Sequence, residues 1–135
     1  MNHSHYLNTD LEIESHEDLT PIVEYFGEDV LVLYNGEAMG HRRASFEIPG
    51  LVADADAVIN HFCMLAETLP ERERAIWNHC SKRVFDIGFE SGTHPRAFQS
   101  EIRPKTIERV AALGAGIVVT IYSPSPDQEG EGSDT

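Results

Sequence analysis

Four residues of the kinds that bind zinc occur in the middle of the chain. His61, Cys63, His79 and Cys80 supply imidazole and thiolate groups, which suit this metal. Their spacing argues against a shared site, because on a helix His61 and Cys63 point about 200° apart. His79 and Cys80 are adjacent, and the sequence has no Cys-x-x-Cys pair. We therefore predict two buried, unreactive thiols and no metal site.

Other patterns that could indicate catalysis also have the wrong spacing. A cysteine nucleophile needs a base within reach, yet Cys80 and its neighbour His79 diverge by about 100° on a helix. Glu12 and Glu14 share one face of a predicted strand, where two carboxylates would share a proton only inside a pocket that excludes water. Gly114-Ala115-Gly116 closes a helix, whereas a dinucleotide-binding loop opens one. The sequence thus predicts no catalytic residue and no cofactor.

Two groups of residues remain as candidates for binding. The first is a polar loop after a predicted strand, at a tip where scaffold loops commonly bind ligands. It contains Glu90, Ser91, Gly92, His94 and Arg96. The alternative is a pocket between sheet and helices, lined by Trp77, His79 and Phe89. That pocket would need a concave, partly apolar cavity with converging polar groups.

The charge of the chain is concentrated at its two ends. Nine acidic residues precede Arg42, four follow Arg109, and the segment between is balanced, which accounts for the net charge of −13. DNA, RNA and anionic membranes bind chiefly through Lys and Arg, so the charge predicts no nucleic-acid and no membrane partner. It is compatible with simple solubility or with a basic protein partner steered by the electrostatic field.

Length and composition indicate one domain. A chain of 135 residues, 41% of them hydrophobic, can bury a single core. It has no apolar run of the roughly 18 residues that span a bilayer, and its N-terminus lacks the features of a secretory signal. We expect a cytoplasmic protein whose two cysteines stay reduced. The predicted organisation is a flexible N-terminus over 1–8, an α+β domain over 9–123 and a disordered acidic tail over 124–135.

The hydrophobic periodicity predicts the order βαββααββαβ, with a mainly antiparallel sheet and helices packed on one face. Asn35-Gly36 favours a hairpin turn, Asp54 or Asp56 caps the longest helix, and Pro104 starts the last one. A strand is expected over 97–102. The β-branched run from Gly116 to Tyr122 is typical of a central strand.

This order, with several short patterns, resembles the bacterial domain of unknown function 4279 family over residues 9–122. The patterns are Asp18-Leu19-Thr20-Pro21 before a helix that ends at Gly27, Leu69-Pro70 between helices, Phe89-Glu90-Ser91-Gly92, Phe98, and Leu113-Gly114 followed by Ile121-Tyr122. The chain departs from the family in its short first helix and in having no glycine between Lys82 and Val84. The resemblance implies a fold and a bacterial cytoplasmic setting, without a substrate.

Three hypotheses about function follow. The leading one is a non-enzymatic protein-binding module that engages a basic partner through the acidic N-terminal region or the loop at 90–96; small acidic immunity proteins are an analogy for it. The alternative is a small-molecule binder or enzyme that uses the pocket between sheet and helices. The third is a symmetric homodimer through a free edge strand.

Overall fold

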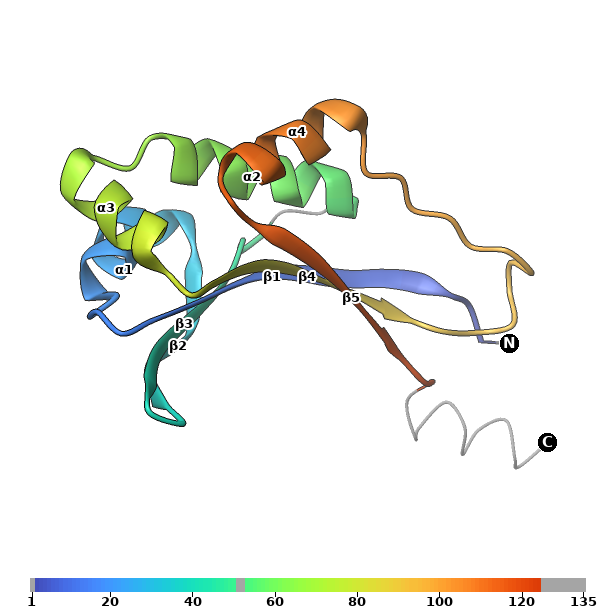
Figure 1. The fold of residues 1–135 in the computed structure, drawn as a ribbon. Coiled ribbons are helices and arrows are strands. Elements are labelled where there is room, and N and C mark those ends of the chain that lie inside the picture. Colours follow the sequence, from blue (N-terminus) through green and yellow to red (C-terminus); the bar gives the residue numbers. More distant parts are fainter. Residues whose placement is uncertain (1, 51–52, 125–135) are drawn as a thin grey trace.

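A five-stranded sheet carries four helices on one of its faces in the computed structural model, which describes residues 2–50 and 53–124 (Figure 1). The strands lie in the order β2-β3-β1-β4-β5. The elements are β1 (His5–Ser15), α1 (Thr20–Phe26), the 3-10 turn η1 (Gly27–Asp29), β2 (Leu31–Ala38), β3 (His41–Glu47), α2 (Ala55–Glu67), α3 (Glu71–His79), β4 (Lys82–Glu90), α4 (Pro104–Ala112) and β5 (Gly116–Tyr122).

The α+β class and the mainly antiparallel sheet are confirmed, but the predicted order has one strand too many. Only β4 and β5 are parallel; the other three neighbouring pairs are antiparallel. The strand expected over 97–102 is absent, and residues 91–103 run to α4 without regular structure. Two parallel neighbours need a connection that returns the chain to the starting end of the sheet. The segment 91–103 with α4 is that connection, so the order is βαββααβαβ.

The hairpin turn between β2 and β3 lies four residues after the predicted one. Met39 and Gly40 form it, with positive φ angles of 53° and 84°, as a type I′ turn requires. Asn35 and Gly36 lie inside β2, opposite Ala44 and Arg43. A side chain at Gly36 would come within 3.2 Å of the Tyr34 hydroxyl, so this glycine makes room for the tyrosine ring and does not form the turn.

Regular structure begins closer to the N-terminus than the side-chain pattern predicts. β1 begins at His5, so residues 5–8, expected to be loose, belong to the sheet and pair with β4. Residues 2–4 also bond to the loop after β4: Ser4 N donates to His94 O (2.6 Å) and Thr93 N donates to Asn2 O (2.9 Å). These contacts are between backbone groups, which explains why hydrophobic periodicity missed them. Of the tail predicted over 124–135, residues 125–135 lie outside the described residues.

The core lies between the helices and one face of the sheet. Leu11, Ile13 and Phe85 are fully buried on the strands, and α2 covers them with Ile59 and Phe62. Burying side chains of this size stabilises the fold by about 1.5–3 kcal/mol each. The predicted cap of α2 is confirmed at Asp54, whose carboxylate accepts a hydrogen bond from Ala57 N (2.9 Å). No helix within 2–50 and 53–124 is long and apolar enough to cross a membrane.

Candidate functional site

The two cysteines lie in the core, where their thiols are unreactive. Burial raises the pKa of Cys63 and of Cys80 to about 11, so both thiols are protonated near neutral pH. Cys80 also donates to Ile76 O (3.3 Å). A protonated thiol is a poor nucleophile and a poor metal ligand. Within 2–50 and 53–124, no group of three or more His, Cys, Asp or Glu side chains is placed to hold a metal ion.

The acidic residues of β1 lie on the face of the sheet that the helices leave uncovered, and Glu12 and Glu14 pair with different basic residues. Glu12 accepts from Arg43 (2.9 Å), and Glu14 lies 3.4 Å from Lys82 Nζ. These two carboxylates therefore form separate ion pairs and do not share a proton. Asp10 lies on β1, the middle strand of the sheet. Burial, together with the carboxylates of Glu47 and Asp86, raises the pKa of Asp10 to about 6.

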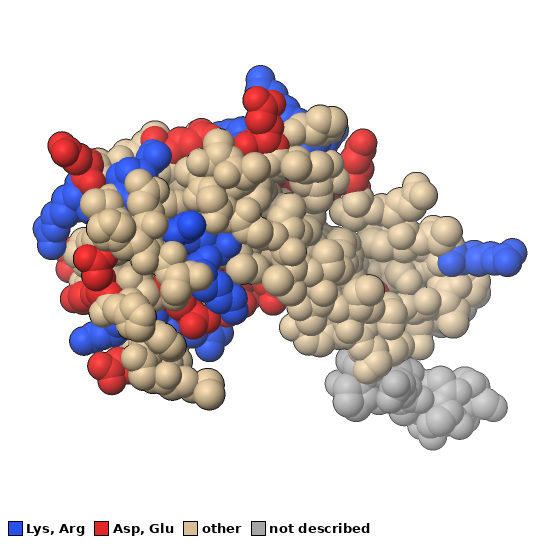
Figure 2. Space-filling model, viewed as in Figure 1, with Lys and Arg blue, Asp and Glu red and all other residues tan. Residues whose placement is uncertain are grey.

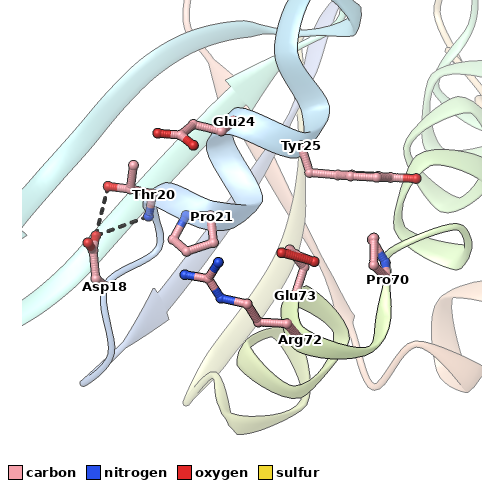
Figure 3. A pocket seen from close by; sticks show the side chains of 8 residues that line it. All are labelled: Asp18, Thr20, Pro21, Glu24, Tyr25, Pro70, Arg72 and Glu73. Atoms are coloured by element: carbon pink, nitrogen blue, oxygen red, sulfur yellow. Dashed lines mark hydrogen bonds between the residues drawn. The ribbon is translucent and has the colours of Figure 1, made fainter.

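A groove of about 470 Å³ separates α1 from α3 (Figure 3). Two of its polar side chains already have partners: Asp18 accepts from Thr20 N and Oγ1, and Tyr25 donates its hydroxyl to Thr68 O in the connection between α2 and α3. Figure 3 shows that Arg72 extends from α3 towards Pro21, whereas Glu24 points away from Arg72. The groove thus lacks the converging polar groups of a ligand site.

A second hollow, of about 360 Å³, lies where the C-terminal ends of β4 and β5 meet the irregular segment 91–103. Aromatic and aliphatic side chains form most of its wall, and the Phe98 ring stands edge-on to Phe89 with centroids 5.7 Å apart. The lining residues are Ser4, Phe89, Glu90, Ser91, Phe98, Ser100, Val119 and Ile121. We call this the β4–β5 hollow. It has the size and the largely apolar lining of a ligand pocket.

The β4–β5 hollow brings together only part of the predicted binding loop. Glu90 and Ser91 line it. Gly92 instead anchors the N-terminal segment: it donates its amide to Ser4 Oγ, and a β-carbon there would lie 2.6 Å from Asn2 O. The His94 ring lies beside His3, with centroids 6.0 Å apart. Arg96 is exposed and is not among the lining residues.

The alternative pocket of Trp77, His79 and Phe89 does not form. Trp77 is fully buried and donates its indole N–H to Leu113 O (2.9 Å), so the core is solid there. His79 is exposed and faces Glu17 at 3.5 Å. Trp77 O accepts from Arg83, near the start of β4, whereas Phe89 is six residues further along the strand. At the rise of an extended strand this separation is about 20 Å.

The strand predicted to be central, β5, lies at the edge of the sheet. On its outer side no strand within the described residues pairs with it. Its apolar side chains are exposed on both faces: Ile117, Val118, Val119, Ile121 and Tyr122 keep 38–67% of their surface. The sequence from 110 to 126 contains no charged residue, which is the one sequence signal that distinguishes this stretch.

Charged side chains are unevenly distributed over the surface. In Figure 2 they lie over the end of the molecule where Figure 1 places α1, α3 and the β2–β3 hairpin, and along the top, where it places α2 and α4. The opposite end, formed by the ends of β4 and β5 and by segment 91–103, is mostly uncharged in this view. The candidate site is therefore a surface with few charges that combines the outer edge of β5 with the β4–β5 hollow, where Glu90 is the acidic lining residue.

Comparison of the chain with protein-family models, with curated proteins and with solved structures found no match. The resemblance to the domain of unknown function 4279 family stays a prediction.

Proposed function

We propose that this chain is a non-enzymatic protein-binding module that takes up an extended segment of its partner along the free edge of β5. The observation that carries the proposal is the strand itself. β5 has seven residues without charge or proline, and its register with β4 has no bulge. Natural sheets usually protect their edges with such features, so an unprotected edge indicates a place for another strand.

An added strand would make backbone hydrogen bonds that any sequence can form and side-chain contacts that favour particular sequences. The outward N–H and C=O groups of β5 offer hydrogen bonds to any extended backbone. Selectivity would come from side chains, because every second residue of the added strand lies beside the row formed by Ile117, Val119 and Ile121. The last two of these residues line the β4–β5 hollow. An apolar side chain of the partner fits there.

The charges support an apolar partner over a basic one. Of the nine carboxylates before Arg42, the two at the middle and end of β1 are already paired, Glu12 with Arg43 and Glu14 with Lys82. The candidate site contributes a single acid, Glu90, whose side chain is only 13% exposed and lies 3.9 Å from His5 Nε2. We therefore propose a partner segment that is extended, uncharged and rich in aliphatic or aromatic residues.

A second candidate function is the binding of a small apolar molecule in the β4–β5 hollow. Its volume of about 360 Å³ supports this candidate, because ligand pockets are usually about 300–1,000 Å³ and largely apolar. The hydroxyls of Ser91 and Ser100 would orient a polar end of such a molecule. The two candidates differ in their dependence on the backbone edge of β5.

Selection from a displayed peptide library tests the proposed function without a known partner. We expect the wild type to enrich peptides with alternating apolar residues, and Val119→Lys to weaken their binding at least about tenfold. Leu33→Lys places the same charge on the other edge strand and serves as the matched control. Equal enrichment on wild type and Val119→Lys would refute binding at β5. Phe98→Ala separates the candidates, since it opens the hollow and leaves the edge intact.

A further inference from the structure

We infer that the partner of β5 is a second copy of this chain, joined through antiparallel pairing of the two β5 strands about a two-fold axis at Val119. This inference rests on the proposed function and names its partner. An interface between identical subunits must be complementary to itself, and the edge of β5 meets this requirement.

The residues of β5 pair well with themselves in this register. With Val119 opposite its own copy, Ile117 faces Ile121 of the second copy, and Val118 faces Thr120 of the second copy. Directly opposite residues of an antiparallel pair project from the same face of the sheet. The row that continues the helix-covered side, Ile117, Val119 and Ile121, thus meets an identical aliphatic row. All seven residues of the strand take part.

The largest side chain of β5 meets its smallest residue. In the same register Tyr122 stands opposite Gly116 of the second copy. A β-carbon placed on Gly116 would have no atom within 4 Å, so the space beside it is open. In the single chain the Tyr122 ring lies beside Gly88 of β4. On pairing, the ring turns outward to lie across Gly116 of the second copy, an arrangement that stabilises glycines in sheets. A register shifted by two residues would lose this fit at both ends.

The charge distribution allows two copies of an acidic chain to approach at β5. Each copy carries a net charge of −13, which opposes association. The stretch from 110 to 126 is uncharged, so no like charges meet across the strand pair. Repulsion between the remaining charges acts over a longer range and is screened by salt. Self-association at β5 therefore strengthens as salt is added, whereas binding of an acidic surface to a basic protein weakens.

The other edge of the sheet is a poorer place for a second copy. The pairing of β2 with β3 shifts register between Val32 and Tyr34, so the strand is bulged. Glu37 and Arg42 place charges near the tip of the hairpin, 3.7 Å apart. Bulges and charges are the features by which natural edge strands avoid pairing. The inference is therefore specific to β5.

The resulting dimer is weak, because a seven-residue strand pair covers less surface than the roughly 1,200–2,000 Å² of stable interfaces. We expect a dissociation constant on the order of 10 μM. The two-fold axis stands perpendicular to the sheet, so the two sheets join into one and the helices of both copies lie on the same side.

Sedimentation of the full chain over concentrations from about 1 μM to about 1 mM tests the inference. We expect a reversible dimer that tightens with sodium chloride. Val119→Lys and Val119→Glu should each weaken it at least about thirtyfold, because like charges then meet on the axis. Mixing the two variants should restore association, since Lys faces Glu in the mixed dimer. Leu33→Lys should dimerise like the wild type.

Two outcomes would overturn the inference. A wild type that stays monomeric at about 1 mM excludes the second copy as partner. A mixture of Val119→Lys and Val119→Glu that does not associate, beside a wild type that does, excludes the register. If the chain is monomeric but still selects peptides in a Val119-dependent manner, the proposed function stands and the partner is a different protein. If it does neither, both proposals fail.

Discussion

The two edges of the sheet expose similar amounts of apolar surface and differ in how they are interrupted. On β2, Leu31 keeps 51% of its surface, and on β5, Val119 keeps 55%. β2 contains a bulge, and the ion pair between Glu37 of β2 and Arg42 of β3 places charges at the hairpin end of this edge. On β5 no such feature interrupts residues 116–122. Exposure of aliphatic residues therefore does not identify a binding edge, whereas an uninterrupted backbone with uncharged side chains does.

The layers behind the two edges differ as well. Beside β2, Phe46 of β3 is fully buried and its ring packs edge-on against Phe26 of α1, with centroids 5.3 Å apart. Beside β5, the helix-covered face ends in the β4–β5 hollow, where Phe98 keeps 41% of its surface. One end of the molecule is thus filled for stability, and the other leaves apolar surface free for a partner.

The greatest loss of stability is expected when a side chain is truncated at the filled end of the molecule, and a truncation on β5 gives the comparison. Phe46→Ala should lower the free energy of unfolding by about 3–5 kcal/mol, because it leaves a cavity in a filled core. Ile121→Ala on β5 should lower it by less than about 1 kcal/mol, because Ile121 is already 67% exposed. Urea unfolding of the two variants, at a concentration where the chain is monomeric, measures both values. Equal losses would contradict the contrast between the two ends.

The next prediction concerns the pH dependence of stability and rests on Asp10, which lies on the middle strand β1. Its pKa of about 6 lies above the unfolded value near 3.8, so the folded state holds a proton that the unfolded state releases. Wild-type stability should therefore fall as pH rises from about 4 to about 6. Asp10→Asn mimics the protonated form and should raise the free energy of unfolding at pH 7 by on the order of 1 kcal/mol, a value reduced by solvent screening.

Unfolding of wild type and Asp10→Asn between pH 4 and pH 7 measures this difference. Asp18 gives a control of opposite sign, because hydrogen bonds from Thr20 lower its pKa. Asp18→Asn should therefore be less stable than the wild type, and this difference should stay nearly constant between pH 4 and pH 7, because the carboxyl titrates below this range in both states. Parallel pH profiles for Asp10→Asn and wild type would refute the raised pKa.

The smallest effect is local to the hairpin that ends the protected edge. Met39 has a positive φ of 53° and is 99% exposed, so its side chain makes few contacts that could offset the unfavourable backbone. Met39→Asn should raise the free energy of unfolding by about 0.5–1 kcal/mol, because asparagine tolerates this conformation better. Gly40→Ala, at a φ of 84°, should have the opposite sign. Thermal unfolding of the two variants checks both directions.

Most helices and strands could be predicted from the sequence, and the candidate site only in part. The apolar stripe of α2, its cap at Asp54 and the start of α4 at Pro104 follow from signals within a few residues. Glu90 and Ser91 were predicted as binding residues and line the hollow. Phe98, Val119 and Ile121 were missed, because their proximity depends on the parallel pairing of β4 with β5 and on the return of segment 91–103.

Local features follow from the order of residues alone: the periods of the strands and helices, the α+β class, and an uncharged stretch from 110 to 126. These depend on hydrogen bonds and side-chain burial within short segments. The position of β5 at the sheet edge and the hairpin turn at Met39 and Gly40 follow only from the folded arrangement of the strands. The composition of a strand favours extended backbone, but which strands pair with it depends on contacts between residues far apart in the chain.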